Sequence, residues 1–411
     1  MRKVKQPNVF SAFASRNYTL YFFGRAVSQF GTWMQRTAVI WVVYSITHSP
    51  FLIGVTIFAE LFPSFLFSIP GGVAADRYNR YTIIKITQVT SMVQAVLLAV
   101  LVIMGHTVIW AILLLSVLLG IINAFDIPAR QSLLHEVVAS PEHLPNAVSL
   151  TTATASLAQL LGPALSGIVL SVFGAGVCFL LNAASFGGVI LSLLLMKLPA
   201  YQPKINRKKV MAEFVEGFTY IKNAPEIGLV IAMIALISLM VSYNTVLPVF
   251  AKVVFRGGAS TFGYINSFIG VGAVTGTIFL ASRKPGAPLK RILFAGIVLM
   301  GSGLVCFSQI KSFPLAMLFA AIAGFGGMAQ YTASNIMVQS GSVPAMRGRA
   351  IGILLMAIFG MAPLGSLITG AVSEHIGAPA TVLAQGVIAI VIGLLFIRFL
   401  LRPAKEVSAE K

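Results

Sequence analysis

The chain has 411 residues, of which 57% are hydrophobic and only 10% are charged. A soluble protein carries about 25% charged residues, so this composition leaves too little polar surface to cover a soluble body of this size. It also excludes intrinsically disordered and nucleic-acid-binding proteins, because both classes need charge-rich or aromatic-poor sequence. The apolar runs continue for about 20 residues instead of alternating over about 10, which predicts an all-α polytopic membrane protein.

These runs, bounded by charges, proline or glycine, predict twelve membrane-spanning helices. Their centres lie near Gly31, Phe62, Val96, Leu119, Ala158, Gly188, Leu239, Gly270, Gly301, Ala329, Phe359 and Ile390. The net charge of +18 comes from lysine and arginine residues between the runs, most of them on the side that the two termini share. The positive-inside rule therefore predicts cytoplasmic termini in a multi-pass protein of the inner (cytoplasmic) membrane.

The predicted spans form two sets of six. We expect a six-helix bundle at residues 1–198, a basic cytoplasmic linker at 199–226 and a second six-helix bundle at 227–411. The linker carries apolar residues at helical spacing, opposite lysine and glutamate, which predicts a short amphipathic helix on the inner membrane surface. Its apolar residues are Met211, Phe214, Val215, Phe218 and Ile221.

The two sets also repeat in sequence. Three glycines of the fifth span recur in the eleventh at a constant shift: Gly162, Gly167 and Gly174 correspond to Gly365, Gly370 and Gly377. An internal duplication of this kind is typical of transporters whose two pseudo-symmetric bundles enclose a cavity near the middle of the membrane.

The first span carries a polar stripe. Its members, which fall within about 100° of arc at about 100° per residue, are Arg25, Gln29, Thr32, Trp33 and Arg36. Such a stripe faces a cavity or the interior of a bundle, because charges at membrane depth are too costly to face lipid.

Two acids lie at membrane depth, Glu60 in the second span and Asp126 in the fourth, which also carries Asn123. Counting from the helix ends places Arg25 level with Asp126, and Arg36 level with Glu60 nearer the outer surface. We therefore expect two ion pairs, Arg25–Asp126 and Arg36–Glu60, each neutralising a charge that hydrocarbon does not tolerate alone.

Two interpretations of these pairs stay open. In the first, one acid, Asp126 before Glu60, exchanges a proton as the cavity alternates between the two sides, because making or breaking a contact with arginine changes the acid's affinity for protons. In the second, both pairs are static contacts that fix helix packing, since structural ion pairs are common.

The loop after the second span reads GGVAADRYNR and resembles the inner-loop signature of the major facilitator superfamily, G-x-x-x-D-R-x-G-R. Asn79 replaces the second glycine, which is tolerable because asparagine adopts positive φ more readily than most residues. The resemblance implies that Asp76 faces the inner end of the eleventh span and that Arg80 pairs with Glu136. The alternative is that these charges only set the topology. The residues expected to act in gating here are Gly72, Asp76, Arg77, Arg80, Glu136, Arg347 and Arg349.

The fifth span contains LAQLLGPALSG, which resembles the superfamily's motif of proton-driven exporters, with Ala158 at a usual glycine position. We expect Gly162 and Pro163 to bend the helix and Gly167 to let a neighbouring helix pack closely, so all three are candidate gating residues.

Three further segments, RNYTLYFFGRAVSQFGTWMQ, NAFDIPARQSLLHEVV and LPNAVSL, together look like the branch of the superfamily that holds the enterobactin exporter and the macrolide-efflux proteins. This resemblance implies export of an amphipathic organic molecule driven by inward proton flow. One departure matters: Ser116 stands four residues before Gly120, where the wider superfamily often has an arginine, so any coupling role of that arginine does not transfer.

The second half has no deep charge. Its polar residues are Tyr243 and Asn244 in the seventh span and Gln330, Tyr331 and Asn335 in the tenth. The resemblance implies that the first, fourth, seventh and tenth spans line the cavity, so these residues, with Gln29, Trp33 and Asn123, are candidate substrate contacts. Aromatic and amide groups with few charges suit large amphipathic ligands, and the two arginines of the first span favour anionic or neutral substrates over simple cations.

Other function classes fit less well. The histidines lack metal-ligand spacing, and no Gly-rich phosphate loop is present, so we expect no enzyme activity, no metal and no cofactor. The expected partners are a small amphipathic substrate (a drug, a macrolide-like compound or a siderophore), protons and membrane lipid, without nucleic acid, for a chain acting as a monomer. A lysophospholipid-translocating protein, a proton-coupled importer and a non-transporting receptor remain alternatives.

Overall fold

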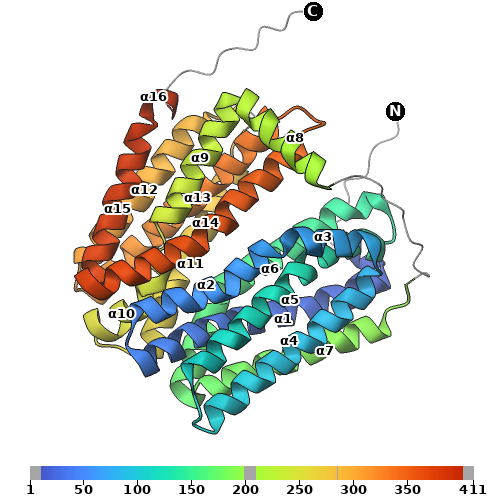
Figure 1. Cartoon of the computed structure of the whole chain (residues 1–411), viewed down its shortest axis with the longest axis horizontal. Helices are drawn as coiled ribbons and strands as arrows, with labels where there is room; N and C mark the ends of the chain where they lie inside the picture. Colours follow the sequence, from blue (N-terminus) through green and yellow to red (C-terminus); the bar gives the residue numbers. More distant parts are fainter. Residues whose placement is uncertain (1–10, 199–209, 285, 401–411) are drawn as a thin grey trace, which may run out of the picture. The chain divides into compact units, whose positions relative to one another are not determined.

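The computed structural model describes residues 11–198, 210–284 and 286–400, and within these ranges the chain is helical without any strand. The first half contains α1 (Arg16–Thr47), α2 (Pro50–Leu66), α3 (Ser68–Arg77), α4 (Arg80–Ile103), α5 (Ile109–Val137), α6 (Leu144–Phe173) and α7 (Ala175–Leu195). The second contains α8 (Val210–Asn223), α9 (Pro225–Met240), α10 (Leu247–Val249), α11 (Ala259–Ala281), α12 (Leu289–Gln309), α13 (Phe313–Gly341), α14 (Arg347–Ile376), α15 (Ala378–Leu395) and α16 (Ile397–Leu400) (Figure 1).

All of the predicted span centres lie in helices, which confirms the all-helical membrane fold. Among the described residues, 10 helices are long and apolar enough to cross a membrane, or 11 if α2 and α3, which meet at a bend of 47°, form one span. The 32-residue α1 is not among them, because its polar stripe lowers its mean hydropathy. Twelve spans and cytoplasmic termini therefore stay predictions.

The contacts divide the chain into two units. Unit 1 comprises Met1–Lys208, Asn244–Ser267 and Ser366–His375, and unit 2 comprises Lys209–Tyr243, Phe268–Gly365 and Ile376–Lys411. In unit 1, α1 packs against α6 and α7, α4 packs against α7, and α2 packs against α5 (Figure 1). In unit 2, α12 packs against both α13 and α15. The predicted bundle boundaries at residues 198 and 227 remain a prediction.

The sequence repeat has a counterpart in the backbone. Gly174 joins α6 to α7 with a φ of 81°, and Gly377 joins α14 to α15 with a φ of 82°. Only glycine adopts this region without strain, which explains why the same residue occurs at both joints. The two helices that precede these joints, α6 and α14, are both 30 residues long.

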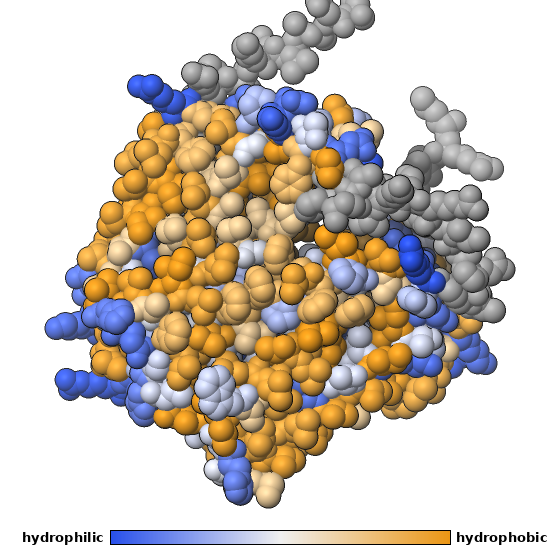
Figure 2. Space-filling model, in the orientation of Figure 1, coloured by the Kyte–Doolittle hydropathy of each residue, from blue (hydrophilic) through white to orange (hydrophobic). Residues whose placement is uncertain are grey.

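Large apolar side chains point outward from the helices. Trp110 and Leu114 on α5, Leu194 on α7 and Leu395 on α15 are each more than half exposed. Apolar residues cover most of the face seen in Figure 2. Exposed apolar area of this extent would be unfavourable in water and matches a surface in contact with lipid.

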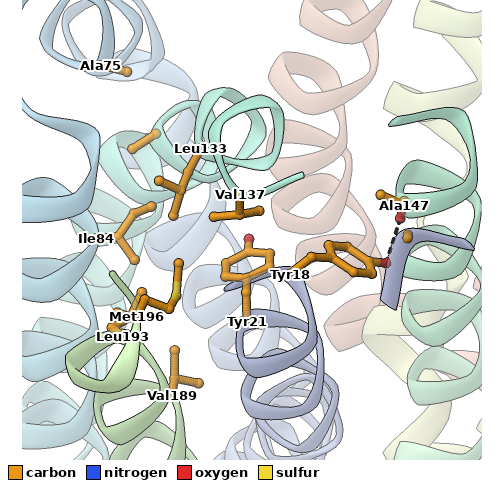
Figure 3. Close-up of a cluster of buried hydrophobic side chains, with 12 residues drawn as sticks. Tyr18, Tyr21, Ala75, Ile84, Leu133, Val137, Ala147, Val189, Leu193 and Met196 are labelled. Atoms are coloured by element: carbon orange, nitrogen blue, oxygen red, sulfur yellow. Dashed lines mark hydrogen bonds between the residues drawn. The ribbon is translucent and has the colours of Figure 1, made fainter. Parts of the chain in front are cut away.

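A cluster of buried side chains holds one end of unit 1 together, where α1, α4, α5, α6 and α7 come close. The Tyr18 hydroxyl donates to the carbonyl oxygen of Ala147 at 3.1 Å, and Tyr21 points the other way, toward Val137 (Figure 3). Tyr18 is fully buried, as are Leu133 and Leu193. Because lipid is as apolar as these side chains, the cluster stabilises the helices mainly through close packing and hydrogen bonds.

Candidate functional site

Asp126 is the most buried charged group among the described residues of unit 1, at 3% exposure. Its Oδ1 accepts hydrogen bonds from the Thr87 hydroxyl at 2.7 Å and from Gln88 Nε2 at 3.0 Å, both on α4. Its Oδ2 lies 2.6 Å from Nη2 of Arg130, one turn further along α5. Both oxygens of the carboxylate are therefore engaged, and its charge is balanced inside its own helix.

The expected Arg25–Asp126 ion pair is wrong as a direct contact. Arg130 takes that place, because α5 continues to Val137 and keeps Arg130 inside the helix. The i,i+4 spacing on one helix face brings the two side chains together.

The Asp126 site is not fully satisfied. Nε of Arg130 and Oε1 of Gln88 are buried and have no hydrogen-bond partner within the part of the chain that the structure describes. Buried polar groups without partners are uncommon in folded proteins, and each calls for an explanation such as a bound molecule or a second arrangement of the site.

The second expected ion pair, Arg36–Glu60, is present. Nε and Nη2 of Arg36 both lie 2.8 Å from Oε1 of Glu60, and the Arg36 guanidinium lies 5.6 Å from the centre of the Trp33 ring. The side chains are 34% and 17% exposed, respectively. Trp33, predicted as a substrate contact, thus supports Arg36 by a cation–π interaction.

A small hollow, with room for about one water-sized group, opens between α1 and α6. It is lined by Tyr21, Phe22, Arg25, Ala26, Gln29, Thr151 and Thr154. Gln29 is 8% exposed, and its Oε1 has no hydrogen-bond partner among the described residues. Two members of the predicted polar stripe, Arg25 and Gln29, therefore line one concavity.

Part of the predicted inner-loop arrangement is present. Arg80 forms the expected ion pair with Glu136, and its Nε also donates to the carbonyl oxygen of Ala75 at 3.0 Å. Asp76 and Arg77, at the end of α3, are exposed. Asn79 has a φ of −64° and caps α4 by accepting a hydrogen bond from the amide of Tyr81. Asparagine therefore suits this position because it caps the helix, and not because it adopts positive φ.

The glycine that allows close packing here is Gly71. A Cβ atom at Gly71 would collide with the backbone of Ala124 on α5, whereas one at Gly72 would meet nothing within 4 Å. Residue 71, and not residue 72, therefore faces α5. A gating role for Gly72 stays a prediction.

At the start of α14, Arg347 is exposed and Arg349 forms an ion pair with Glu216 of α8 at 2.7 Å. The amide of Val343 also donates to the Tyr220 hydroxyl of α8 at 3.1 Å. A helix, α8, thus lies within the predicted linker and is attached to α14 within unit 2, while its place on the cytoplasmic membrane surface stays a prediction. The pairing of Asp76 with this region stays a prediction.

The α6 glycines make close helix contacts. A Cβ at Gly162 would collide with Cβ of Trp33 on α1, and one at Gly167 would lie 3.0 Å from Cα of Gly263 on α11. The helix continues through Pro163 without interruption, and Ser166 donates to the carbonyl oxygen of Met34 at 3.1 Å. Small residues here let α6 pack directly against its neighbours.

The remaining predicted cavity residues have mixed environments. Gln330 is buried on α13 with an unpartnered Oε1 among the described residues, and Asn335 accepts from Gln339 at 2.6 Å. Tyr331 and Asn123 are half-buried. Tyr243 and Asn244 lie in the short 3₁₀ helix that separates α9 from α10. Their meeting in one cavity stays a prediction.

Sequence reasoning missed a chain of buried amides. Asn182 Nδ2 donates to Gln35 Oε1 at 2.8 Å, and Gln35 Nε2 donates to Gln94 Oε1 at 2.9 Å. Gln94 then donates to the Leu115 carbonyl oxygen at 3.2 Å. One signal was available, since Gln35 directly precedes Arg36 in the first span. The chain joins α1, α4, α5 and α7 and fixes how these helices pack.

The sequence matches the family described as "Transmembrane secretion effector" over residues 8–411. Over 386 residues it is 26% identical to the Staphyloferrin A transporter of Staphylococcus aureus (strain NCTC 8325 / PS 47), covering 92% of this chain and 95% of that protein. It is 21% identical to the multidrug efflux pump Tap of Mycolicibacterium fortuitum, with coverage of 91% and 93%. It is 23% identical to the enterobactin exporter EntS of Shigella boydii serotype 4 (strain Sb227), with coverage of 92% and 90%.

Solved structures agree on the fold. The nucleoside transporter NupG (D323A mutant) superimposes with a TM-score of 0.74 at 15% identity, covering 93% of this chain and 99% of that one. A bacterial homolog of the human lysosomal transporter Spinster gives a TM-score of 0.70 at 15% identity, covering 93% and 95%.

Proposed function

The chain belongs to the transmembrane secretion effector family of the major facilitator superfamily, and from this premise we propose that it is a proton-coupled exporter of amphipathic organic molecules. The relatives named above carry siderophores or drugs, so the substrate is a small organic molecule of comparable chemistry. The single observation that carries proton coupling is Asp126, a carboxylate buried in an apolar helix and held by Arg130, Thr87 and Gln88.

The proposed architecture follows the sequence prediction. Twelve spans form bundles at residues 1–198 and 227–411, with both termini and α8 on the cytoplasmic side. Polar residues of both bundles would line a central cavity that opens to each side in turn. The contact of α8 with α14 through Glu216 and Arg349 supports a linker attached to the second bundle.

The proposed coupling step is a change of partner at Asp126. A buried carboxylate is tolerated while Arg130 balances its charge, and it takes up a proton when that arginine moves away, because an isolated charge is costly in an apolar interior. The unpartnered Nε of Arg130 and Oε1 of Gln88 support a second arrangement in which these groups bond differently. The proton would therefore bind in one conformation and leave in the other.

The other charged contacts would control access. Arg80 and Glu136 hold the end of α5 to the start of α4, and Arg36–Glu60 joins α1 to α2. Breaking such contacts on one side and forming them on the other is the physical requirement for two alternating states of similar free energy.

The test begins by identifying a substrate. Cells with and without the protein are compared for the metabolites and dyes they retain, and a retained compound is then loaded into proteoliposomes containing the purified protein. Under an inward proton gradient, the proposal predicts substrate moving out against its own gradient, with loss of that movement when a protonophore is added. Substrate accumulating inside would instead identify an importer, an outcome that matters because the name of the Staphyloferrin A transporter states no direction. A substrate flux that is the same with and without the proton gradient would overturn proton coupling.

A further inference from the structure

The charges of unit 1 do not balance around α1. Arg36 is matched by Glu60 and Arg130 is matched by Asp126, each at ion-pair distance. Arg25 makes no ion pair or hydrogen bond with any residue in the described ranges, and Asp126, the acid expected to pair with it, has both its oxygens engaged elsewhere. The Asp126 region therefore keeps one surplus positive charge.

This surplus charge lies at a concavity. Arg25 lines the hollow between α1 and α6 together with Gln29, Thr151 and Thr154, and aromatic side chains from Tyr21 and Phe22 complete the wall. The hollow is therefore apolar on one part of its wall and carries a guanidinium, a carboxamide and two hydroxyls on the rest. Such a combination is typical of sites that hold an amphipathic molecule by one polar group.

A second observation points to a ligand. Gln29 is only 8% exposed, and its Oε1 has no hydrogen-bond partner among the residues described. The hydroxyls of Thr151 and Thr154 donate to the backbone carbonyls of Ala147 and Leu150, so their protons are already engaged. The strongest donor in the hollow is therefore the Arg25 guanidinium, whose planar fork suits an oxyanion.

We propose that the hollow between α1 and α6 binds an anionic oxygen group of the transported substrate, a carboxylate or a similar oxyanion, through Arg25. The inference rests on the proposed export function and deepens it, because it makes the preferred substrates amphipathic acids. The hollow has room for little more than this oxygen group, so the apolar body of the substrate lies outside it, and Gln29 Oε1 receives a neighbouring hydrogen-bond donor.

The test uses a matched pair of probes, naphthalene-1-acetate and its neutral analogue naphthalene-1-acetamide, in equilibrium binding to the purified full chain in detergent. The wild type is expected to bind the acid at least about tenfold more tightly than the amide, since a charge-assisted hydrogen bond in a partly buried site is worth that factor or more. Arg25→Gln removes this preference while keeping amide binding, and Arg25→Lys retains part of it. Arg283→Gln, the same change at an exposed arginine just after α11, leaves the preference intact.

Binding of the amide by Arg25→Gln shows that this variant is folded. The binding result is independent of the proposed function, because a failed proton-driven flux assay would overturn export without changing the preference for the acid. Three outcomes would overturn the site: no saturable binding of the acid, equal binding of acid and amide by the wild type, or an acid preference that survives in Arg25→Gln. Displacement of naphthalene-1-acetate by stoichiometric phosphatidylglycerol would also overturn it, because Arg25 would then hold a lipid headgroup and not a substrate.

Discussion

The two acids of unit 1 occupy very different surroundings. Asp126 engages both oxygens with three partners, and its side chain is 4% exposed. Glu60 engages one oxygen with a single partner, Arg36, and this pair is 17% and 34% exposed. Water can take over from a partner at the more exposed pair, whereas the buried carboxylate depends on its neighbours alone. Because Asp126 depends on its protein partners alone, we assign the coupling proton to Asp126 and a supporting role to Glu60.

The two sites share one packing surface. A Cβ at Gly120 would collide with the backbone of Glu60, and a Cβ at Gly71 would collide with the backbone of Ala124, two residues from Asp126. The helix α5 therefore lies directly against α2 and α3 at both acids. A shift of α5 along this surface would alter both surroundings at once.

Arg130→Gln gives the largest effect that we expect on stability. It leaves the buried Asp126 carboxylate without its counter-charge, which costs about 3–5 kcal/mol. Thermal unfolding of the purified protein in detergent measures this loss. The double variant Asp126→Asn with Arg130→Gln should recover most of it, because no buried charge is left alone. Equal losses in the single and double variants would show that Arg130 acts by packing.

Thr87→Val should have the next largest effect and lower the free energy of unfolding by about 1.5–3 kcal/mol, because it removes a hydrogen bond to a charged carboxylate. Thr90→Val is the matched control one turn along α4, where the hydroxyl bonds only to the Ile86 carbonyl oxygen and the change is expected to stay within about 0.5 kcal/mol. The same unfolding assay compares them, and an equal effect at both positions would mean that Asp126 does not depend on Thr87.

Gly71→Ala tests the packing beside Asp126. The added methyl group collides with the α5 backbone, and overpacking of this kind costs about 1–3 kcal/mol. Gly72→Ala, at the neighbouring residue, has open space and should be as stable as the wild type or slightly more so. The contrast is read from the two unfolding midpoints, and a destabilised Gly72→Ala with a tolerated Gly71→Ala would reverse our assignment of the packing face.

Glu60→Gln should have the smallest effect on stability, a loss of about 1 kcal/mol or less, because Arg36 is partly exposed and keeps its contact with the Trp33 ring. Transport is expected to persist at a reduced rate, measured as substrate flux in proteoliposomes under an inward proton gradient. Complete loss of coupled flux, with downhill exchange intact, would move the coupling proton from Asp126 to Glu60.

The sequence predicted the Arg36–Glu60 pair because each residue is the conspicuous charge of its own apolar run and the two lie at matching depth. It did not predict Asp126–Arg130, because the end of α5 carries enough polar residues to resemble a loop, and helix ends are difficult to place from composition. Thr87 and Gln88 were missed for another reason: uncharged polar residues are common in membrane helices, and only the fold shows which of them face a carboxylate.

The sequence also does not show which glycine of a pair faces the neighbouring helix. A glycine pair such as Gly71–Gly72 predicts close helix packing, but which of the two faces the neighbour depends on the rotation of α3, which follows the 47° bend after α2. The joints at Gly174 and Gly377, in contrast, follow from the repeat alone, since a constant shift of glycines implies the same backbone in both places.

The most direct test of the account is substrate-driven proton movement in proteoliposomes that hold the pH dye pyranine and the substrate found by the retention screen. Dilution lets the substrate leave down its gradient, and the account predicts acidification of the lumen by the wild type and by Glu142→Gln, a change at an exposed loop acid. It predicts no acidification by Asp126→Asn, although that variant still exchanges labelled for unlabelled substrate. Acidification by Asp126→Asn at the wild-type rate would contradict the account.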